Sequence, residues 1–225
     1  MGIFALSTLL VAGAGIYIFS KVFPNFQPGN KKIQADLKKM REEMRPDTDG
    51  LVPFSSRDLE LLSAKEEDRK VKKRFTTQIK GKLSTIFHEP VAYYAYKHYL
   101  SSSGKDALLF VKTARHDYYY WIKAKGAKVV IDDRLIGTLD PGGRLLSGKQ
   151  QQEVARIIRQ EKEYQPLIVF GKEVANLARY AGVEQKKGPS ERAFGYVADK
   201  LDPHEEAILL SITFYEMIVV RQEKP

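Results

Sequence analysis

The sequence predicts an α+β protein: an N-terminal single transmembrane helix, then an antiparallel β-barrel or strongly curved sheet that encloses a hydrophobic C-terminal helix. Three observations support this fold class. Residues 3–20 carry no charge, alternating and aromatic-rich segments follow from about residue 75, and residues 207–220 are almost entirely apolar. The expected domains are a transmembrane anchor at 1–23, a juxtamembrane amphipathic helix and linker at 24–74, and a β-rich domain at 75–225.

The composition limits the chemistry. The chain has 225 residues, a formal net charge of +9 and no cysteine. This length accommodates one membrane segment and one domain with a substantial core. Without cysteine, thiolate metal sites, disulfides and a cysteine nucleophile are excluded.

The N-terminal stretch is long enough to span a bilayer, because 18 helical residues rise about 27 Å against roughly 30 Å of hydrocarbon. A cleaved signal peptide is the alternative, but no Lys or Arg precedes the stretch and apolar sequence continues beyond its small residues. Basic residues follow the stretch, which predicts an N-terminus outside and a cytoplasmic C-terminal domain. The candidate membrane-surface contacts are Lys21, Lys31, Lys32, Lys38, Lys39 and Arg41.

Two helices are expected before the β-rich region. Residues 31–44 place Ile33, Leu37, Met40 and Met44 on one face, as in an amphipathic helix. Residues 59–75, "LELLSAKEEDRKVKKRF", are expected to form a second helix with a strongly basic end. That end is a candidate contact for lipid or RNA, although a solvated face is the simpler interpretation.

Alternation then predicts strands. "FTTQIKGKLSTIF" alternates, with Gly81 marking a bend or bulge, and "SSSGKD" connects two tyrosine-rich strands. Such aromatic strands can stack bases or sugars, but aromatic residues are also ordinary strand formers, and no nucleic-acid partner is expected. Residues 130–139 align with residues 168–177, which predicts two similar β-hairpins, with a helix at residues 150–163 between them.

No local motif indicates catalysis, a cofactor or a metal. "GRLLSGKQ" resembles a phosphate-binding loop, but Gln150 stands where the hydroxyl for Mg²⁺ is required. The four histidines have no metal-binding spacing. We therefore expect a protein that is not an enzyme and has no cofactor.

The C-terminal apolar stretch is too short to cross a bilayer, since 14 helical residues rise only about 21 Å. Asp202, Pro203 and Glu205 are typical of a helix start. Apolar residues then surround the helix axis, so protein must enclose it. The residues expected in this enclosed helix are Ile208, Leu209, Ile212, Phe214, Met217 and Ile218.

The segments "KVVIDDRLIGTL", "PLIVFGKEVANL" and "DPHEEAILLSITFYEMIVV" resemble the tubby C-terminal-like superfamily over roughly residues 75–221. This superfamily includes the phospholipid scramblases and the LURP-one-related proteins. The resemblance implies a β-barrel around a hydrophobic C-terminal helix. No acidic segment like the calcium-binding one that accompanies this helix in scramblases follows Val220 in the sequence, and the resemblance assigns phosphoinositide contacts to no particular positions.

A weaker similarity, carried by "IFHEPVAYYAYKHYL" and "KVVIDD", is to the GIDE-type domain of membrane ubiquitin ligases. The function expected is a non-catalytic, single-pass membrane-anchored β-domain protein that binds anionic lipid or a membrane protein partner at the cytoplasmic face. The alternatives are an accessory subunit of a membrane complex, or a scramblase-like or GIDE-like accessory protein.

Overall fold

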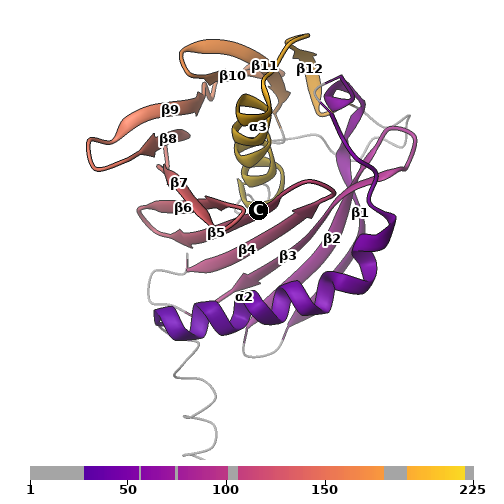
Figure 1. Cartoon of the computed structure of the whole chain (residues 1–225), viewed down its shortest axis with the longest axis vertical. Helices are drawn as coiled ribbons and strands as arrows, with labels where there is room; N and C mark the ends of the chain where they lie inside the picture. Colours follow the sequence, from indigo (N-terminus) through magenta and orange to yellow (C-terminus); the bar gives the residue numbers. More distant parts are fainter. Residues whose placement is uncertain (1–27, 56, 74–75, 101–105, 180–191, 221–225) are drawn as a thin grey trace, which may run out of the picture.

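The computed structural model describes residues 28–55, 57–73, 76–100, 106–179 and 192–220. One antiparallel sheet contains twelve strands, and each strand pairs with its neighbours in sequence. The sheet curls into a nearly closed barrel with α3 in its middle (Figure 1). The strands are β1 Leu62–Lys73, β2 Thr77–Thr85, β3 Pro90–His98, β4 Ala107–Thr113, β5 Asp117–Lys123, β6 Gly126–Ile131, β7 Arg134–Leu139, β8 Arg144–Ser147, β9 Gln152–Ile157, β10 Tyr164–Val169, β11 Lys172–Ala178 and β12 Phe194–Val197.

The first and last strands come together to complete the wall. Ser63 forms an antiparallel bridge with Arg192, and the backbone N–H of Ala193 donates to the carbonyl of Leu62 at 2.7 Å. A 3₁₀ turn, Leu59–Leu61, leads into β1 and packs beside β12. The barrel is therefore closed by a short contact, whereas its other strand pairs form longer ladders.

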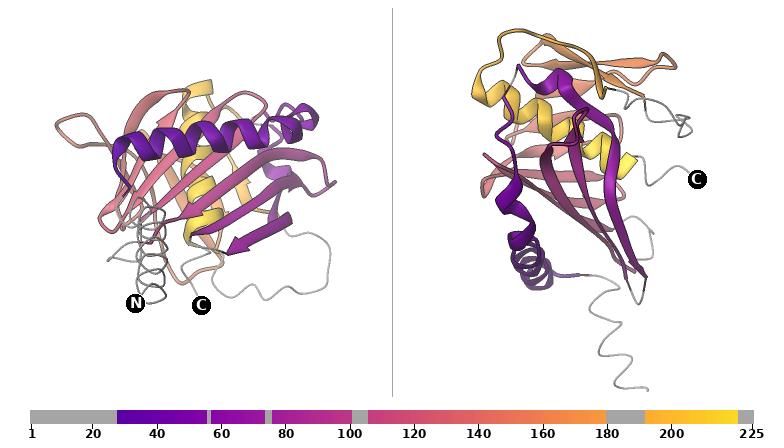
Figure 2. Two further views of the ribbon diagram at one scale, coloured as in Figure 1. Left: turned by 90° about the horizontal axis from the view of Figure 1, so that it is seen from below. Right: turned by 90° about the vertical axis from the view of Figure 1, so that its right-hand side faces the viewer.

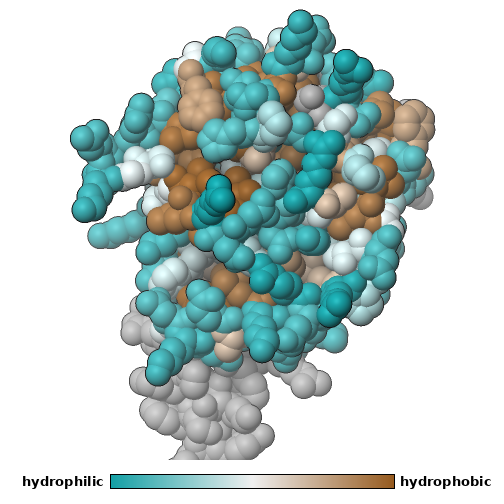
Figure 3. Space-filling model, viewed as in Figure 1, coloured by the Kyte–Doolittle hydropathy of each residue, from teal (hydrophilic) through white to brown (hydrophobic). Residues whose placement is uncertain are grey.

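The interior is filled by helix α3, Pro203–Tyr215, which continues as a π-helical turn, Glu216–Val220. Its apolar side chains and the inward side chains of the strands form one core. In Figure 3, hydrophilic side chains cover much of the visible face, and apolar ones form patches among them. The residues expected in the enclosed helix are all buried: Ile208, Leu209, Ile212, Phe214, Met217 and Ile218.

Helix α2, Asn30–Met44, lies on the outside of the barrel (Figure 2). Its residues Ile33, Met40 and Met44 are buried in a second apolar cluster with outward side chains of β3, β4 and β5. The chain then passes through a 3₁₀ turn, Arg45–Gly50, toward the barrel. The barrel wall thus separates two apolar cores, one inside around α3 and one outside under α2.

The two hairpins expected from the internal repeat are confirmed as β6–β7 and β10–β11. Val129 pairs with Gly137 and Val130 with Leu135, and the same break in register follows Leu167 in β10. Each turn has two consecutive residues with positive φ, Asp132–Asp133 and Phe170–Gly171, as the right-handed strand twist favours. This break in register is a β-bulge, so the two copies of the internal repeat share the bulge as well as the turn.

The strand register aligns a set of outward-facing residues across half of the barrel. Directly paired residues on antiparallel strands point to the same face of the sheet. Leu108 belongs to the cluster under α2, so this face is the outer one. From β1 to β6, the successive partners in this outer row are Lys72, Gln78, Lys97, Leu108, Trp121 and Lys128.

The expected fold class is wrong in its N-terminal transmembrane helix. The structure is a nearly closed antiparallel barrel with two α-helices, α2 and α3, in the described part of the chain. Neither of these helices is long and apolar enough to cross a membrane. Residues 3–20, to which the span was assigned, lie outside the described residues.

Two other helices expected from the sequence are strands. Most of residues 59–75 belongs to β1, and the sheet begins at Leu62, before the expected boundary at residue 75. The far half of β1 is exposed on both faces, which removes the alternation typical of a strand. Most of residues 150–163 belongs to the short strand β9 and its flanking turns, with Ala155 and Ile157 pointing inward.

The bulge expected at Gly81 lies in the neighbouring strand, because the β1–β2 register shifts between Glu67, opposite Lys82, and Lys70, opposite Lys80. The β2–β3 register is continuous there, and Gly81 lies opposite Tyr94. A Cβ atom at this position would come within 2.7 Å of the Tyr94 ring. The glycine therefore makes room for a buried aromatic ring. The two tyrosine-rich strands are β3 and β5, and β4 lies between them.

Candidate functional site

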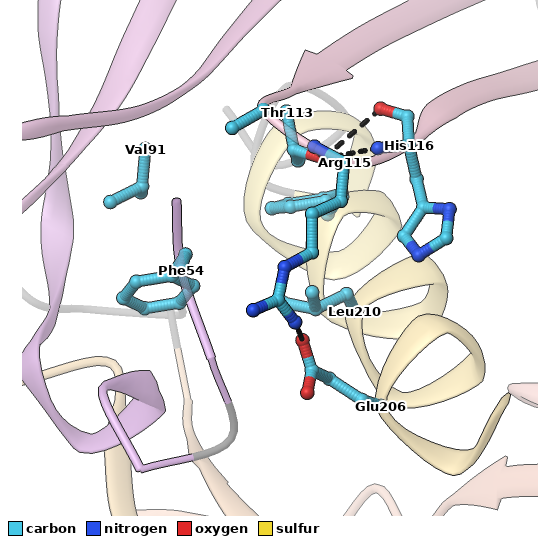
Figure 4. Close-up of a pocket in the computed structure, with 9 residues that line it drawn as sticks. Phe54, Val91, Thr113, Arg115, His116, Glu206 and Leu210 are labelled. Carbon is cyan, nitrogen blue, oxygen red and sulfur yellow. Dashed lines mark hydrogen bonds and ion pairs between the residues drawn. The ribbon is translucent and has the colours of Figure 1, made fainter. Parts of the chain in front are cut away.

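A small cavity lies beside the start of α3, at the end of the barrel that holds the β4–β5 turn (Figure 4). Phe54, Val91 and Leu210 line it, and Arg115 forms an ion pair with Glu206 at 3.5 Å. Its volume of about 10 Å³ is that of roughly one water molecule. The cavity is therefore too small for a substrate or cofactor.

Two histidines form carboxylate pairs at this end. His116 Nδ1 lies 2.6 Å from Asp132 Oδ2, and His88 Nδ1 lies 2.6 Å from Glu67 Oε1. The Ser84 hydroxyl donates to the same Glu67 carboxylate at 2.9 Å. A serine–histidine–carboxylate relay requires the serine to bond the histidine, so this arrangement is not one. The described ranges contain no group of three or more potential metal ligands.

The larger hollow is a groove between α2 and the outer face of β2 and β3, which we call the lysine groove. Its volume is about 140 Å³. Four lysines and two carboxylates line it, together with Gln78 and several apolar side chains. These charged residues are Lys32, Asp36, Lys39 and Glu43 of α2, Lys80 of β2 and Lys97 of β3.

Asp36 forms the buried floor of the lysine groove. Its Oδ2 accepts hydrogen bonds from Lys97 Nζ and from the Tyr99 hydroxyl, both at 2.8 Å, and Lys32 Nζ lies 3.2 Å from its Oδ1. Burial alone would raise the pKa of Asp36. The hydrogen bonds from Lys97 and Tyr99 and the nearby lysine charges outweigh burial and hold that pKa below its usual value. Asp36 is therefore ionised and its charge is compensated.

Glu43 occupies the other, more exposed part. Lys80 Nζ lies 2.8 Å from its Oε2 and Lys39 Nζ lies 3.7 Å from its Oε1. The hydrogen bond from Lys80 lowers the pKa of Glu43, with further contributions from the Lys39 and Lys72 charges. The lining thus holds two more positive charges than negative ones, since four lysines face two carboxylates.

Further lysines extend this charge onto the barrel wall. Lys70 lies directly opposite Lys80, and Lys72 lies opposite Gln78, so both side chains project from the face that carries the groove. Neither Lys70 nor Lys72 forms an ion pair with a residue in the described ranges. Of the two, Lys70 faces a like charge, and the carboxylate of Glu43 compensates that opposite lysine, Lys80.

Charge is distributed unevenly between the two barrel ends. We call the end that carries the β1–β2 and β5–β6 connections the lysine end, defined by Lys70, Lys72, Lys73, Lys123, Lys125 and Lys128. None of these six residues has an ion-pair partner among the described residues. At the opposite end Lys112 lies 2.7 Å from Asp117, and Arg115 and His116 are also paired.

The candidate membrane-surface contacts predicted from the sequence lie in different parts of the structure. Lys32 and Lys39 line the lysine groove, and Lys31 is exposed on α2. Lys38 pairs with Glu42 at 4.0 Å. Arg41 lies over the Tyr119 ring at 5.2 Å and forms ion pairs with Asp117 and Asp133 at the end of the barrel opposite the lysine end. Lys21 lies outside the described residues.

Sequence reasoning missed Lys80 and Lys97, which supply half of the groove's lysines. Both occur at outward positions of alternating strands, where a lysine is ordinary. The available signal was the pair Lys80 and Lys82 around Gly81, which places both charges on one face of a strand. That signal does not show that a helix covers the neighbouring strand.

Comparisons with family models, with curated proteins and with solved structures found no match to this chain. The resemblance to the tubby C-terminal-like superfamily therefore stays a prediction.

Proposed function

We propose that the protein is a non-catalytic binding module that holds a phosphorylated headgroup of an anionic lipid in the lysine groove. The observation that carries this proposal is the excess of lysine over carboxylate in a solvent-accessible hollow, where Lys32, Lys39, Lys80 and Lys97 converge from three elements. Lysine binds phosphate as a compact point charge with three donors.

The size of the lysine groove favours a small anionic group. Its volume of about 140 Å³ is below the roughly 300–1,000 Å³ typical of sites for drug-sized ligands. A single phosphate with part of a sugar ring is of suitable size. The first turn of α2 lies at the groove, contains Lys32 and has no acidic residue, so the helix dipole adds to the positive potential.

Glu43 has a defined role in this proposal. It is partly exposed and pairs with Lys39 and Lys80, so its carboxylate competes with an incoming anion for the same two ammonium groups. Asp36 is buried and holds Lys97 in place. A bound phosphate would displace Glu43 and leave Asp36 undisturbed.

The test is calorimetric titration of the full chain, held in neutral detergent, with soluble inositol phosphates and, separately, with inorganic phosphate. We expect inositol phosphates to bind, and the double variant Lys39→Gln, Lys80→Gln to bind them at least about tenfold more weakly, because charge-assisted hydrogen bonds contribute roughly 1.5–3 kcal/mol each. Glu43→Gln should bind more tightly than the natural chain.

The matched control is Lys149→Gln with Lys162→Gln, which removes the same charge from exposed positions away from the groove. The proposal is wrong if the control pair and the groove pair weaken binding equally, or if the natural chain binds no inositol phosphate. Binding of inorganic phosphate with the same affinity would show that the groove recognises phosphate without a lipid headgroup.

A further inference from the structure

Trp121, the single tryptophan of the chain, lies between two lysines on the outer face of the barrel. Lys123 Nζ is 4.5 Å from the Trp121 ring centre, and Lys128 Nζ is 5.3 Å from it. Part of the tryptophan packs against the apolar cluster under α2, and the side chain is half-buried. The ring therefore has a fixed position at the surface.

The lysines around this ring have no ion-pair partner within the described ranges. Lys123, Lys125 and Lys128 form no ion pair with any residue that the structure describes. The attraction of Lys123 and Lys128 to the ring is a cation–π interaction, which leaves their full positive charge available to a partner. An aromatic ring flanked by uncompensated cations is complementary to an anionic partner that also offers apolar contact.

Trp121 and the lysine groove lie in the same outer row. Lys97 of the groove pairs with Leu108, and Leu108 pairs with Trp121, so the two sites are two strands apart. At about 4.8 Å between neighbouring strands, this separation is about 10 Å. Leu108 is buried under α2, so a partner that contacts both sites does so around the start of this helix, at the lysine end.

We propose that Trp121, with Lys123 and Lys128, forms a second contact with an anionic membrane, in which the indole ring enters the headgroup region. Tryptophan is enriched at this depth because its ring is apolar and its N–H is polar. Lysines near an anionic leaflet strengthen such contacts. The inference rests on the proposed function only in taking a lipid as the partner, and it orients the lysine end toward the membrane.

The experiment uses the natural tryptophan as the probe. The full chain is mixed with vesicles of phosphatidylcholine alone, or of equal parts phosphatidylcholine and phosphatidylserine. With the anionic vesicles, we expect the Trp121 emission to shift to shorter wavelength and to be quenched by brominated lipid. With the neutral vesicles, both effects should be absent, and this comparison removes any contribution that does not depend on lipid charge.

A variant pair tests the role of the lysines. Replacing Lys123→Gln and Lys128→Gln should lower the affinity for anionic vesicles, measured by the Trp121 emission, about thirtyfold. The reason is that each lysine near the surface contributes roughly 1 kcal/mol to binding. The control pair Lys149→Gln and Lys162→Gln should give the response of the natural chain. Added salt should reduce the response, because it screens exposed charges.

Two results would overturn the inference. One is an unchanged Trp121 emission while sedimentation shows the chain bound to anionic vesicles. The other is no preference for anionic over neutral vesicles, which would leave an acidic protein segment as the partner of this face. The titration with soluble inositol phosphates uses no vesicles, so its result separates failure of the lysine groove from failure of the Trp121 contact.

Discussion

The two helices of this protein have opposite positions relative to one sheet. Helix α3 lies inside the barrel and is buried around its whole circumference, whereas α2 lies outside and buries one face. The starts of the helices also differ. Asp202 and Glu205 form a complete capping box on α3, while α2 begins after Gly29 without a side-chain cap.

The difference extends to how each helix accommodates polar groups. In α3, the Ser211 and Thr213 hydroxyls bond to carbonyls of their own helix, and Tyr120 donates to the Ser211 carbonyl at 2.7 Å. Glu216, at its buried end, meets Arg159 at 2.5 Å. In α2, the buried Asp36 instead bonds to the strand wall beneath. The interior helix thus bonds its hydroxyl groups to its own carbonyls and has a buried ion pair at its end, whereas the exterior helix combines an apolar face with a charged anchor in its first half.

The largest effect is expected from a charge inside the barrel. Leu209→Asp should abolish folding, because Leu209 is fully buried and an unpaired carboxylate costs several kcal/mol against a total stability of about 5–15 kcal/mol. Circular dichroism and thermal unfolding would measure this. Leu37→Asp, at a half-buried position of α2, is the control and should leave the barrel folded. Normal folding of Leu209→Asp would contradict the enclosed position of α3.

A smaller effect is expected from the anchor of α2. Asp36→Ala leaves Lys97 buried without its counter-charge, which should destabilise the docked helix by about 3 kcal/mol. Hydrogen exchange should show loss of protection in α2 while the amides of β3 and β4 stay protected. If the whole barrel loses protection together, the two helices are not independent units.

The same contact should depend on pH. The pKa of Asp36 is lowered in the folded protein, so its stabilisation is complete above the unfolded value of about 3.9 and is lost as the pH falls through the lower folded value. Protection of α2 should therefore decrease in this acid range in the natural chain. Asp36→Asn should lack this decrease.

The smallest effect is expected from the helix caps. Asp202→Ala should destabilise the protein by about 1 kcal/mol, because the Asp202 carboxylate accepts from the N–H groups of His204 and Glu205 at 2.8 Å. Gly29→Asp, in open space at the start of α2, should stabilise that helix by a few tenths of a kcal/mol. Urea unfolding would measure both changes in stability. If the two substitutions change the free energy of unfolding by the same amount and in the same direction, the starts of α2 and α3 do not differ as described.

Much of the barrel could be predicted from local pattern. The capping box, the short apolar run and the repeat at residues 130–139 and 168–177 each reflect short-range chemistry, so α3 and the two hairpins could be inferred. The strand β1 could not, because its outer half has no buried face and so no alternation. In β9 the spacing of Val154 and Ile157 fits one face of a helix as well as it fits a strand. Only the pairing with β8 and β10 decides between helix and strand.

The lysine groove could be predicted only in part. Lys32 and Lys39 were recognisable because they belong to an amphipathic helix with a visible charged face. Lys80 and Lys97 became part of the site only through the way α2 lies across β2 and β3, a tertiary contact that no sequence period records. For the same reason, the burial of Asp36 could not be predicted: this residue lies among charged residues in the sequence and is covered only when α2 packs on the barrel.

The order of the elements along the chain has a consequence for folding. Strand β12 must reach β1 to close the wall, and α3, which the wall encloses, follows β12 in the sequence. The strands supply the rest of this core, so without α3 the middle of the barrel has no helix to pack against. The barrel can therefore fill its interior only after α3 has been synthesised, and its closure depends on one contact that is distant in sequence, between Ser63 and Arg192.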